Sequence, residues 1–260
     1  MFVDLSKVHQ RAIIIAAGQG SRWKNYLDND KHFATVNGET LLERTVRLCR
    51  ENNVDDVWVV GRDERYKVDG AQLLLPTLTP EYGGADKFLS SRELWLEEGR
   101  TITLYGDVYF TEQAMHTITT YGHRDWMLFA RPCASKLTRC QWGECFAVTF
   151  FEDHRGEHER TLLKATELYR RGKIMDPSGW QHYRAMTGLP YRLWDTAHVM
   201  ADRIHVIDDW TEDFDTSGDY LRWMAAKAAP CFHCGGPPVD VPIEAADCIA
   251  ALNARERTHG

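Results

Sequence analysis

Two glycines and three cations lie close together near the start of the chain. Gly18 and Gly20 come directly after an apolar run, and Arg22, Lys24 and Lys31 follow them. Glycine lets a ligand approach the main chain closely, and successive exposed N–H groups in such a loop attract anions. The segment therefore predicts a phosphate-binding loop whose cations face solvent. The alternative is an ordinary strand-to-helix turn with solvated charges.

Two common phosphate-binding motifs do not fit this loop. A Walker A loop requires the pattern G-x-x-x-x-G-K-[ST], which the segment lacks. A dinucleotide fingerprint requires a third glycine at position 23, where the helix packs closely on the strand, but Trp23 stands there. The loop therefore argues against a P-loop NTPase and against a dinucleotide-dependent oxidoreductase.

A carboxylate follows another glycine farther along the chain. Asp107 comes after Gly106 in the segment TITLYGDVYF, which is predicted to be a strand over 101–110. Open α/β sheets bind ligands at the carboxyl ends of their strands. Asp107 is therefore predicted to face a ligand, unless it is only a turn residue at the end of the strand.

The elements that must position these residues begin with a strand, a helix and a second strand. The apolar run 12–16 has the length and composition of a central strand that is covered on both faces. Thr40 and Glu43 have the spacing of a capping box before an amphipathic helix over 41–52, and 54–61 is predicted to be the next strand. This order predicts a right-handed crossover between parallel strands.

The remaining chain continues the alternation of strands and helices. Further strands are predicted at 72–76, 126–130 and 144–151, and further helices at 86–98, at 158–172 and after Thr216 or Ser217. We expect an α/β protein with a three-layer α/β/α, Rossmann-like architecture and a mostly parallel, twisted sheet. The main domain is predicted over 1–226, with a nucleotide half at about 11–125 and an acceptor half at about 126–226, before a tail at 227–260 that ends in a short helix.

Two other groups of residues could bind metals. The segment EDHRGEHE, 152–159, places two histidines among acidic residues without a tight ligand spacing, so a solvated turn is predicted there. Cys231 and Cys234 form one C-x-x-C pair, which would supply half of a structural Zn²⁺ site in the tail.

Composition excludes several classes of partner. The formal net charge is -7, which argues against a nucleic-acid-binding protein. No apolar stretch approaches the roughly 18 residues that a membrane helix needs, and the first residues lack the apolar region of a signal peptide. Seven cysteines at irregular spacings are typical of reduced thiols in the cytoplasm. We expect a cytoplasmic protein with small ligands.

The glycine loop and the residues after it resemble a known signature. The segment AAGQGSRWKNYLDNDKHFATVNGETLLERTV resembles that of the nucleotidyltransferases with a GT-A-like fold, A-A-G-x-G-x-R, a lysine, and a G-x-x-L-L segment that enters a helix. This group includes enzymes that act on sugar 1-phosphates, the molybdopterin cofactor, phosphocholine and methylerythritol phosphate. The resemblance implies that Arg22 and Lys31 contact the oxygens of a triphosphate as catalytic cations. It assigns the nucleotide-binding loop to Ala16, Ala17, Gly18, Gly20 and Ser21. Asp30 stands where the family usually has proline.

Three further segments resemble the same group. YGDVYF resembles the strand whose aspartate holds the catalytic Mg²⁺, which gives that role to Asp107. DFDTSGDYLRW resembles the late D-x-D-T-x-x-D segment, which makes Asp215 the second metal ligand and Asp219 a helix-start residue. The alternative is that Asp213 and Asp215 are only charges at the start of a helix, where its dipole favours them. GGADKFLSS resembles the segment that approaches the base and ribose, which assigns Gly83 and Gly84 to nucleotide binding.

An aromatic and basic patch is the candidate acceptor site. Arginine suits recognition of a phosphate, and tryptophan suits the face of a sugar or a quaternary amine, so Trp180 and Arg184 are candidate acceptor-binding residues. The alternative is that both residues pack in the protein interior.

These features together predict a Mg²⁺-dependent nucleotidyltransferase. A phosphorylated sugar or alcohol attacks the α-phosphorus of a nucleoside triphosphate, pyrophosphate leaves, and an NDP-linked product forms. Two alternatives remain at this point, a GT-A glycosyltransferase that uses a nucleotide sugar and a non-catalytic nucleotide-binding module.

Overall fold

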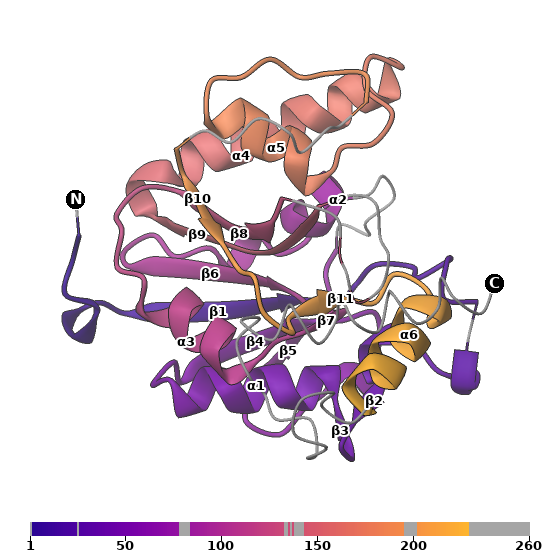
Figure 1. Cartoon of the computed structure of the whole chain (residues 1–260). Coiled ribbons are helices and arrows are strands. Elements are labelled where there is room, and N and C mark those ends of the chain that lie inside the picture. The colour runs from indigo at the N-terminus through magenta and orange to yellow at the C-terminus, as the bar shows by residue number, and fades with distance from the viewer. Residues whose placement is uncertain are drawn as a thin grey trace.

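A seven-stranded sheet lies between two layers of helices (Figure 1). The computed structural model describes residues 2–24, 26–77, 84–132, 135, 137, 143–194 and 202–228. Within these residues the strand order of the sheet is β10-β8-β9-β6-β1-β4-β5. The strands are β1 Gln10–Ile15, β4 Asp56–Val60, β5 Gln72–Leu74, β6 Arg100–Tyr105, β8 Met127–Arg131, β9 Glu144–Phe151 and β10 Ile204–Val206.

Strand β1 lies inside the sheet, between β6 and β4, because its apolar residues can be buried on both faces. It runs parallel to β4 and β6, with Ile13 opposite Trp58 on one side and Thr103 on the other. Strand β9 runs antiparallel to both β6 and β8, and the other strand pairs of this sheet are parallel. The predicted three-layer fold with a mostly parallel sheet is confirmed.

The helices cover the sheet on both sides. Helices α1 Leu41–Glu51 and α3 Glu112–Thr120 lie on one face, and α2 Gly84–Leu89, α4 Glu152–Arg170 and α5 Gly179–Met186 lie on the other (Figure 1). Helix α1 begins as predicted, because the Thr40 hydroxyl accepts from the Glu43 N–H while the Glu43 carboxylate accepts from the Thr40 N–H. No helix in the described ranges has the length and apolar character that crossing a membrane requires.

Smaller elements lie beyond the carboxyl ends of the central strands. Strands β7 Val108–Tyr109 and β11 Glu212–Asp213 pair antiparallel, β2 Thr35–Val36 and β3 Glu39–Thr40 form a hairpin, and α6 Ser217–Ala228 packs beside them. The 3₁₀ helices are η1 Leu5–Lys7, η2 Tyr26–Asp28, η3 Lys31–Phe33, η4 Glu64–Tyr66 and η5 Arg92–Leu94. The predicted helix of the tail and the predicted zinc ligands Cys231 and Cys234 lie outside the described residues.

A second hydrophobic cluster joins these smaller elements. Trp23 from the glycine loop, Phe214 and Trp223 from the β11–α6 region, and Tyr109 from β7 are all buried in it. Trp23 thus occupies the position of the missing third glycine and anchors the loop away from the main core. The cluster fixes the glycine loop relative to the segment that carries Asp215.

Three predicted elements differ from the structure, and one further helix is not predicted. The helix predicted at 86–98 ends at Leu89, because the Ser90 and Ser91 hydroxyls donate to the carbonyls of Lys87 and Phe88 in its last turn. The strand predicted at 101–110 is split into β6 and β7 by the turn at Gly106 and Asp107.

The other two differences involve helices on the upper face in Figure 1. Helix α4 begins at Glu152, so 152–159 is helical and the predicted solvated turn is wrong. His158 faces inward on this helix and is completely buried. Helix α5 lies in a segment that lacks a clear periodicity, and the hydroxyl of Ser178 caps it by accepting from the Gln181 N–H.

Candidate active site

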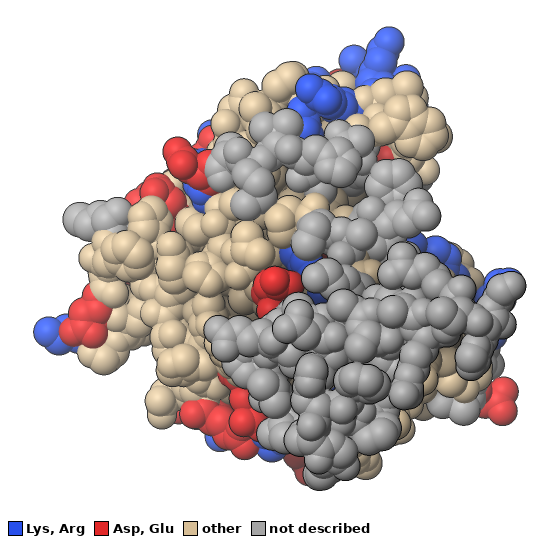
Figure 2. All heavy atoms as spheres, in the orientation of Figure 1, with Lys and Arg blue, Asp and Glu red and all other residues tan. Residues whose placement is uncertain are grey.

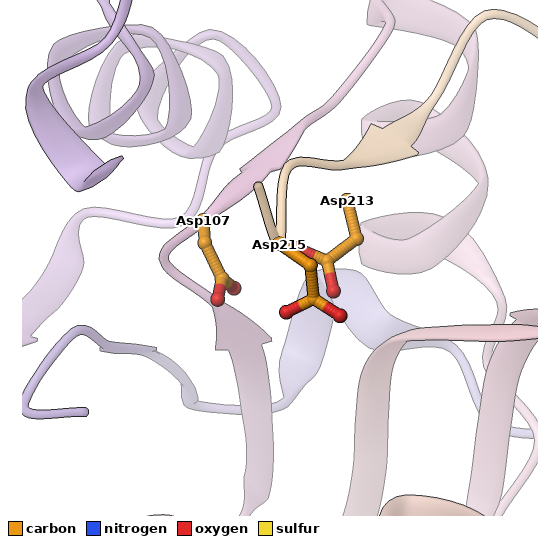
Figure 3. Close-up of side chains that lie close together, drawn as sticks. All are labelled: Asp107, Asp213 and Asp215. Carbon is orange, nitrogen blue, oxygen red and sulfur yellow. The ribbon is translucent and has the colours of Figure 1, made fainter. Parts of the chain in front are cut away.

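Three aspartates meet at the carboxyl edge of the sheet. Asp107 lies in the turn between β6 and β7, Asp213 ends β11, and Asp215 follows two residues later (Figure 3). A carboxylate oxygen of each lies within 4.8 Å of one from each of the others. Three carboxylates at this separation are a suitable ligand set for a hard divalent cation.

Pairing between two short strands brings the aspartates together. Asp213 lies opposite Val108 in the β11–β7 ladder, and the N–H of Phe214 donates to the carbonyl of Asp107 at 3.1 Å. Phe214 is completely buried in the second hydrophobic cluster. Because alternate residues of an extended segment point to opposite sides, burial of Phe214 turns Asp213 and Asp215 toward Asp107.

Asp213 is the aspartate whose environment is least compatible with an isolated negative charge. Its Oδ1 atom is buried and has no hydrogen-bond partner among the described residues. Burial and the charges of Asp107 and Asp215 raise the pKa of Asp213 well above its usual range. A bound cation would satisfy the orphaned oxygen and offset the repulsion, so the residues present fit a metal ion. The sequence predicts only Asp107 and Asp215 as ligands, and the D-x-D spacing around an apolar residue is the signal that identifies the third.

Lys31 is buried among these carboxylates. Its ammonium forms an ion pair with Asp107 and lies 3.4 Å from Oδ1 of Asp215, and 5% of the side chain is exposed. Burial by itself would lower the pKa of Lys31, but the three carboxylates outweigh burial and raise that pKa. Burial would likewise raise the pKa of Asp107, but the positive charge of Lys31 contributes most to holding it well below its usual range. The expectation that Lys31 faces solvent is therefore wrong.

Arg22 contacts the same cluster from the solvent side. Its NH2 group donates to Oδ1 of Asp215 at 2.7 Å, while 66% of its side chain is exposed. The chain reaches this position through Gly20, whose φ of +59° lies in the left-handed region that favours glycine. Arg22 thus has the exposure that the sequence predicts, and its charge is held beside the carboxylates.

Asp30 supports the position of Lys31 in place of the proline that the family usually has. Its φ of -74° is close to the value that a proline ring imposes. Its carboxylate accepts from Arg62 at 2.5 Å and from the Tyr66 hydroxyl at 3.2 Å. These contacts hold the entry to η3, and therefore Lys31, by side-chain bonds instead of by a ring.

The other predicted residues of the glycine loop lie beside this cluster. Ala16 and Ala17 are buried, and the N–H of Ala16 donates to the carbonyl of Val60 at 2.9 Å. Ser21 is exposed next to Arg22. Their contact with a nucleotide stays a prediction.

The predicted base and acceptor residues have other surroundings. A Cβ on Gly84 would lie 3.1 Å from a backbone oxygen in 177–179, so glycine lets α2 pack against that turn, and Gly83 lies outside the described residues. Trp180 and Arg184 on α5 are buried, and each donates to a backbone carbonyl. The nucleotide-binding and acceptor-binding roles of these residues stay predictions.

Sequence reasoning misses one cation at this edge. Lys87 on α2 is half-buried, and its Cε would lie 3.0 Å from a Cβ built on Gly18. The segment GGADKFLSS contains this lysine, but sequence reasoning assigns a role only to Gly83 and Gly84, because Lys87 and Gly18 meet only when α2 packs on the sheet.

Comparison with known proteins identifies the part of the chain that carries the loop and Asp107. Residues 12–120 match the family model described as the MobA-like NTP transferase domain. No curated protein matches the chain.

Solved structures have a similar fold over most of the chain. An inositol-1-phosphate CTP transferase from T. maritima has a TM-score of 0.52 and 12% identity, covering 84% of this chain and 95% of that one. A CTP:phosphocholine cytidylyltransferase from Streptococcus pneumoniae has a TM-score of 0.50 and 14% identity, covering 83% of this chain and 97% of that one. At these identities the likeness establishes the fold. Arg22, Lys31 and Asp107 lie within the residues that match the family model. Asp213 and Asp215 lie beyond its last matched residue, 120.

Proposed function

We propose that the protein is a Mg²⁺-dependent nucleotidyltransferase that transfers NMP from a nucleoside triphosphate to a phosphorylated sugar or alcohol. An oxygen of the acceptor's phosphate bonds to the α-phosphorus, the bond from that phosphorus to the bridging oxygen breaks, and pyrophosphate leaves. The observation that carries this proposal is the meeting of Asp107, Asp213 and Asp215 with Lys31 and Arg22 beside the glycine loop of an NTP transferase domain.

The loop and its cations are suited to hold the triphosphate. The loop follows β1 at the edge of the sheet where α/β proteins bind ligands, and its glycines leave the main chain open to phosphate oxygens. Arg22 is exposed and can exchange its bond with Asp215 for one with phosphate. Phosphoryl transfer depends mainly on positioning and on neutralising oxygen charge, which these groups provide.

The three aspartates would hold Mg²⁺ at the same place. Bound there, Mg²⁺ would neutralise charge on the phosphate oxygens and on the departing pyrophosphate. The protein needs no general base for this reaction, because the attacking phosphate oxygen is already anionic at neutral pH. The match to an NTP transferase family favours this function over a glycosyltransferase, and carboxylates kept together with cations favour it over a non-catalytic module.

The described surface agrees with small charged substrates. Figure 2 shows one face of the molecule, on which the described Lys and Arg side chains lie in small separate groups. A nucleic-acid-binding face would instead present a continuous basic stripe. The acceptor assignment to Trp180 and Arg184 would require these buried side chains to become accessible.

Thermal shift with a panel of nucleoside triphosphates tests the proposal. Each triphosphate is added with and without Mg²⁺, and the best is then used to follow pyrophosphate release with a set of phosphorylated acceptors. Ligand at about 100 times its Kd stabilises a protein by about 2.7 kcal/mol, which should raise Tm by about 5–10 °C in a domain of this size. If no triphosphate gives a Mg²⁺-dependent shift in Tm, the proposed function is refuted.

A further inference from the structure

Lys87, on helix α2, places its ammonium beside Gly18 of the glycine loop. A Cβ built on Gly18 would lie 3.0 Å from Cε and 3.5 Å from Nζ of Lys87. Glycine at position 18 therefore leaves room for the end of the Lys87 side chain. The charge of Lys87 also reaches Asp107, where it is among the groups that lower the pKa of that carboxyl.

The neighbours of Lys87 hold it in this position. Phe88 is buried and packs edge-on against Tyr105, and Asp86 accepts from the Thr166 hydroxyl at 2.9 Å. The N–H of Ala85 donates to the carbonyl of Pro177 at 2.8 Å. Helix α2 is thus fixed to the sheet, to α4 and to the turn before α5, and only the flexible end of Lys87 is left to adapt to a ligand.

Lys87 differs from the other two cations in its partners. Lys31 and Arg22 both form ion pairs with Asp215. In the ranges that the structure describes, the ammonium of Lys87 forms neither a hydrogen bond nor an ion pair. A half-buried ammonium without a hydrogen-bond or ion-pair partner loses hydration, and its longer-range attraction to Asp107 offsets only part of that loss, so it favours an anion that can enter the loop.

We propose that Lys87 binds the β- and γ-phosphates of the triphosphate, and the pyrophosphate that leaves. This inference rests on the proposed function and extends it by a third phosphate-binding residue. The triphosphate tail is the ligand, not the acceptor's phosphate, because Lys87 lies against Gly18 of the nucleotide loop. Lys31 and Arg22 are held by carboxylates, so the charge of Lys87 is available to an anion before either of those contacts is broken.

Binding of inorganic pyrophosphate with Mg²⁺ to the full chain tests the inference by isothermal titration. Lys87→Met and Lys87→Gln should each raise the Kd for pyrophosphate about 10- to 100-fold, the range for loss of a charge-assisted contact, while Lys87→Arg should recover most of the affinity. Binding of the NMP of the preferred base should change less than threefold. Lys7→Met is the matched control, because Lys7 is exposed before β1, at the opposite end of that strand, and its loss should leave the Kd unchanged.

The Tm of each variant without ligand separates binding from folding. Loss of Lys87 removes only its longer-range attraction to Asp107, so this Tm should fall less than it does in Lys31→Met, whereas a purely structural role would lower it as much. Wild-type affinity for pyrophosphate in both Lys87→Met and Lys87→Gln, or an effect confined to the KM of the acceptor, would overturn the inference and leave the proposed function intact. A wild-type chain that binds neither pyrophosphate nor any triphosphate would overturn both.

Discussion

Lys31→Met should lower the Tm of the protein without ligand far more than Arg22→Met does. Both cations contact Asp215, but 5% of the Lys31 side chain is exposed against 66% of the Arg22 side chain. Loss of Lys31 leaves the buried Asp107 without its ion-pair partner, whereas Asp215 keeps its contact with Arg22. Loss of Arg22 removes one contact that water can largely replace.

The distances give the size of the difference. At the 3.4 Å between Lys31 Nζ and Asp215 Oδ1, opposite charges attract by about 5 kcal/mol at an effective dielectric constant of about 20. Removing one partner of a buried pair costs about 3–5 kcal/mol, whereas an exposed pair contributes about 0–1 kcal/mol. For a domain of this size these values correspond to losses of about 6–20 °C for Lys31→Met and at most about 4 °C for Arg22→Met.

Differential scanning fluorimetry with and without Mg²⁺ measures both effects. Mg²⁺ should recover much of the loss in Lys31→Met, because a cation between Asp107 and Asp215 replaces the missing charge. Adding Asp107→Asn to Lys31→Met should also recover stability, since both partners of the pair are then neutral. Equal losses in Lys31→Met and Arg22→Met would refute the argument from burial. A loss in Lys31→Met that neither Mg²⁺ nor the second substitution reduces would refute the argument from charge.

Three further predictions concern carboxylates and buried histidines. Asp213→Asn removes a buried charge that its neighbours repel, so it should not lower the Tm without ligand. It should weaken Mg²⁺ binding about tenfold or more in a thermal-shift titration. The control Asp208→Asn, at an exposed position, should change neither quantity. Asp219→Asn should retain pyrophosphate release and lose at most about 1 kcal/mol by denaturant titration. Asp219 forms a capping box with Thr216 at the start of α6, and the amide oxygen of asparagine can still accept from the Thr216 N–H. Burial lowers the pKa of His182 to about 3 and holds the pKa of His158 well below the usual 6.5 of a histidine. The unfolded chain therefore binds these protons more readily than the folded protein, so the free energy of unfolding is highest above about pH 6.5. Below that pH it falls by up to about 1.4 kcal/mol per pH unit for each histidine. Tm measured from pH 7 to pH 5 should fall accordingly, and His182→Phe should reduce the slope.

Local sequence patterns determined most of the framework around the site. The apolar residues 12–16 can be satisfied only in a strand buried on both faces, and β1 is that strand. The capping box of Thr40 and Glu43 needs only a few neighbouring residues, so the start of α1 followed from the sequence. Helix α4 shows where a local pattern was present but hidden. Its buried residues are spaced along one helical face, and the first of them is His158, a polar residue type that masks the periodicity.

The tertiary structure alone decided how the charges of the site are arranged. Asp213 joins Asp107 only through the pairing of β11 with β7, and Lys87 meets Gly18 only after α2 has packed on the sheet. Lys31 becomes buried because these carboxylates surround it, although its own neighbours in the sequence are polar. Residue type and spacing fix hydrogen bonds and packing over a few residues, within one turn or one strand. The sign and strength of an electrostatic interaction depend on separation and burial, which the chain acquires only when distant segments meet.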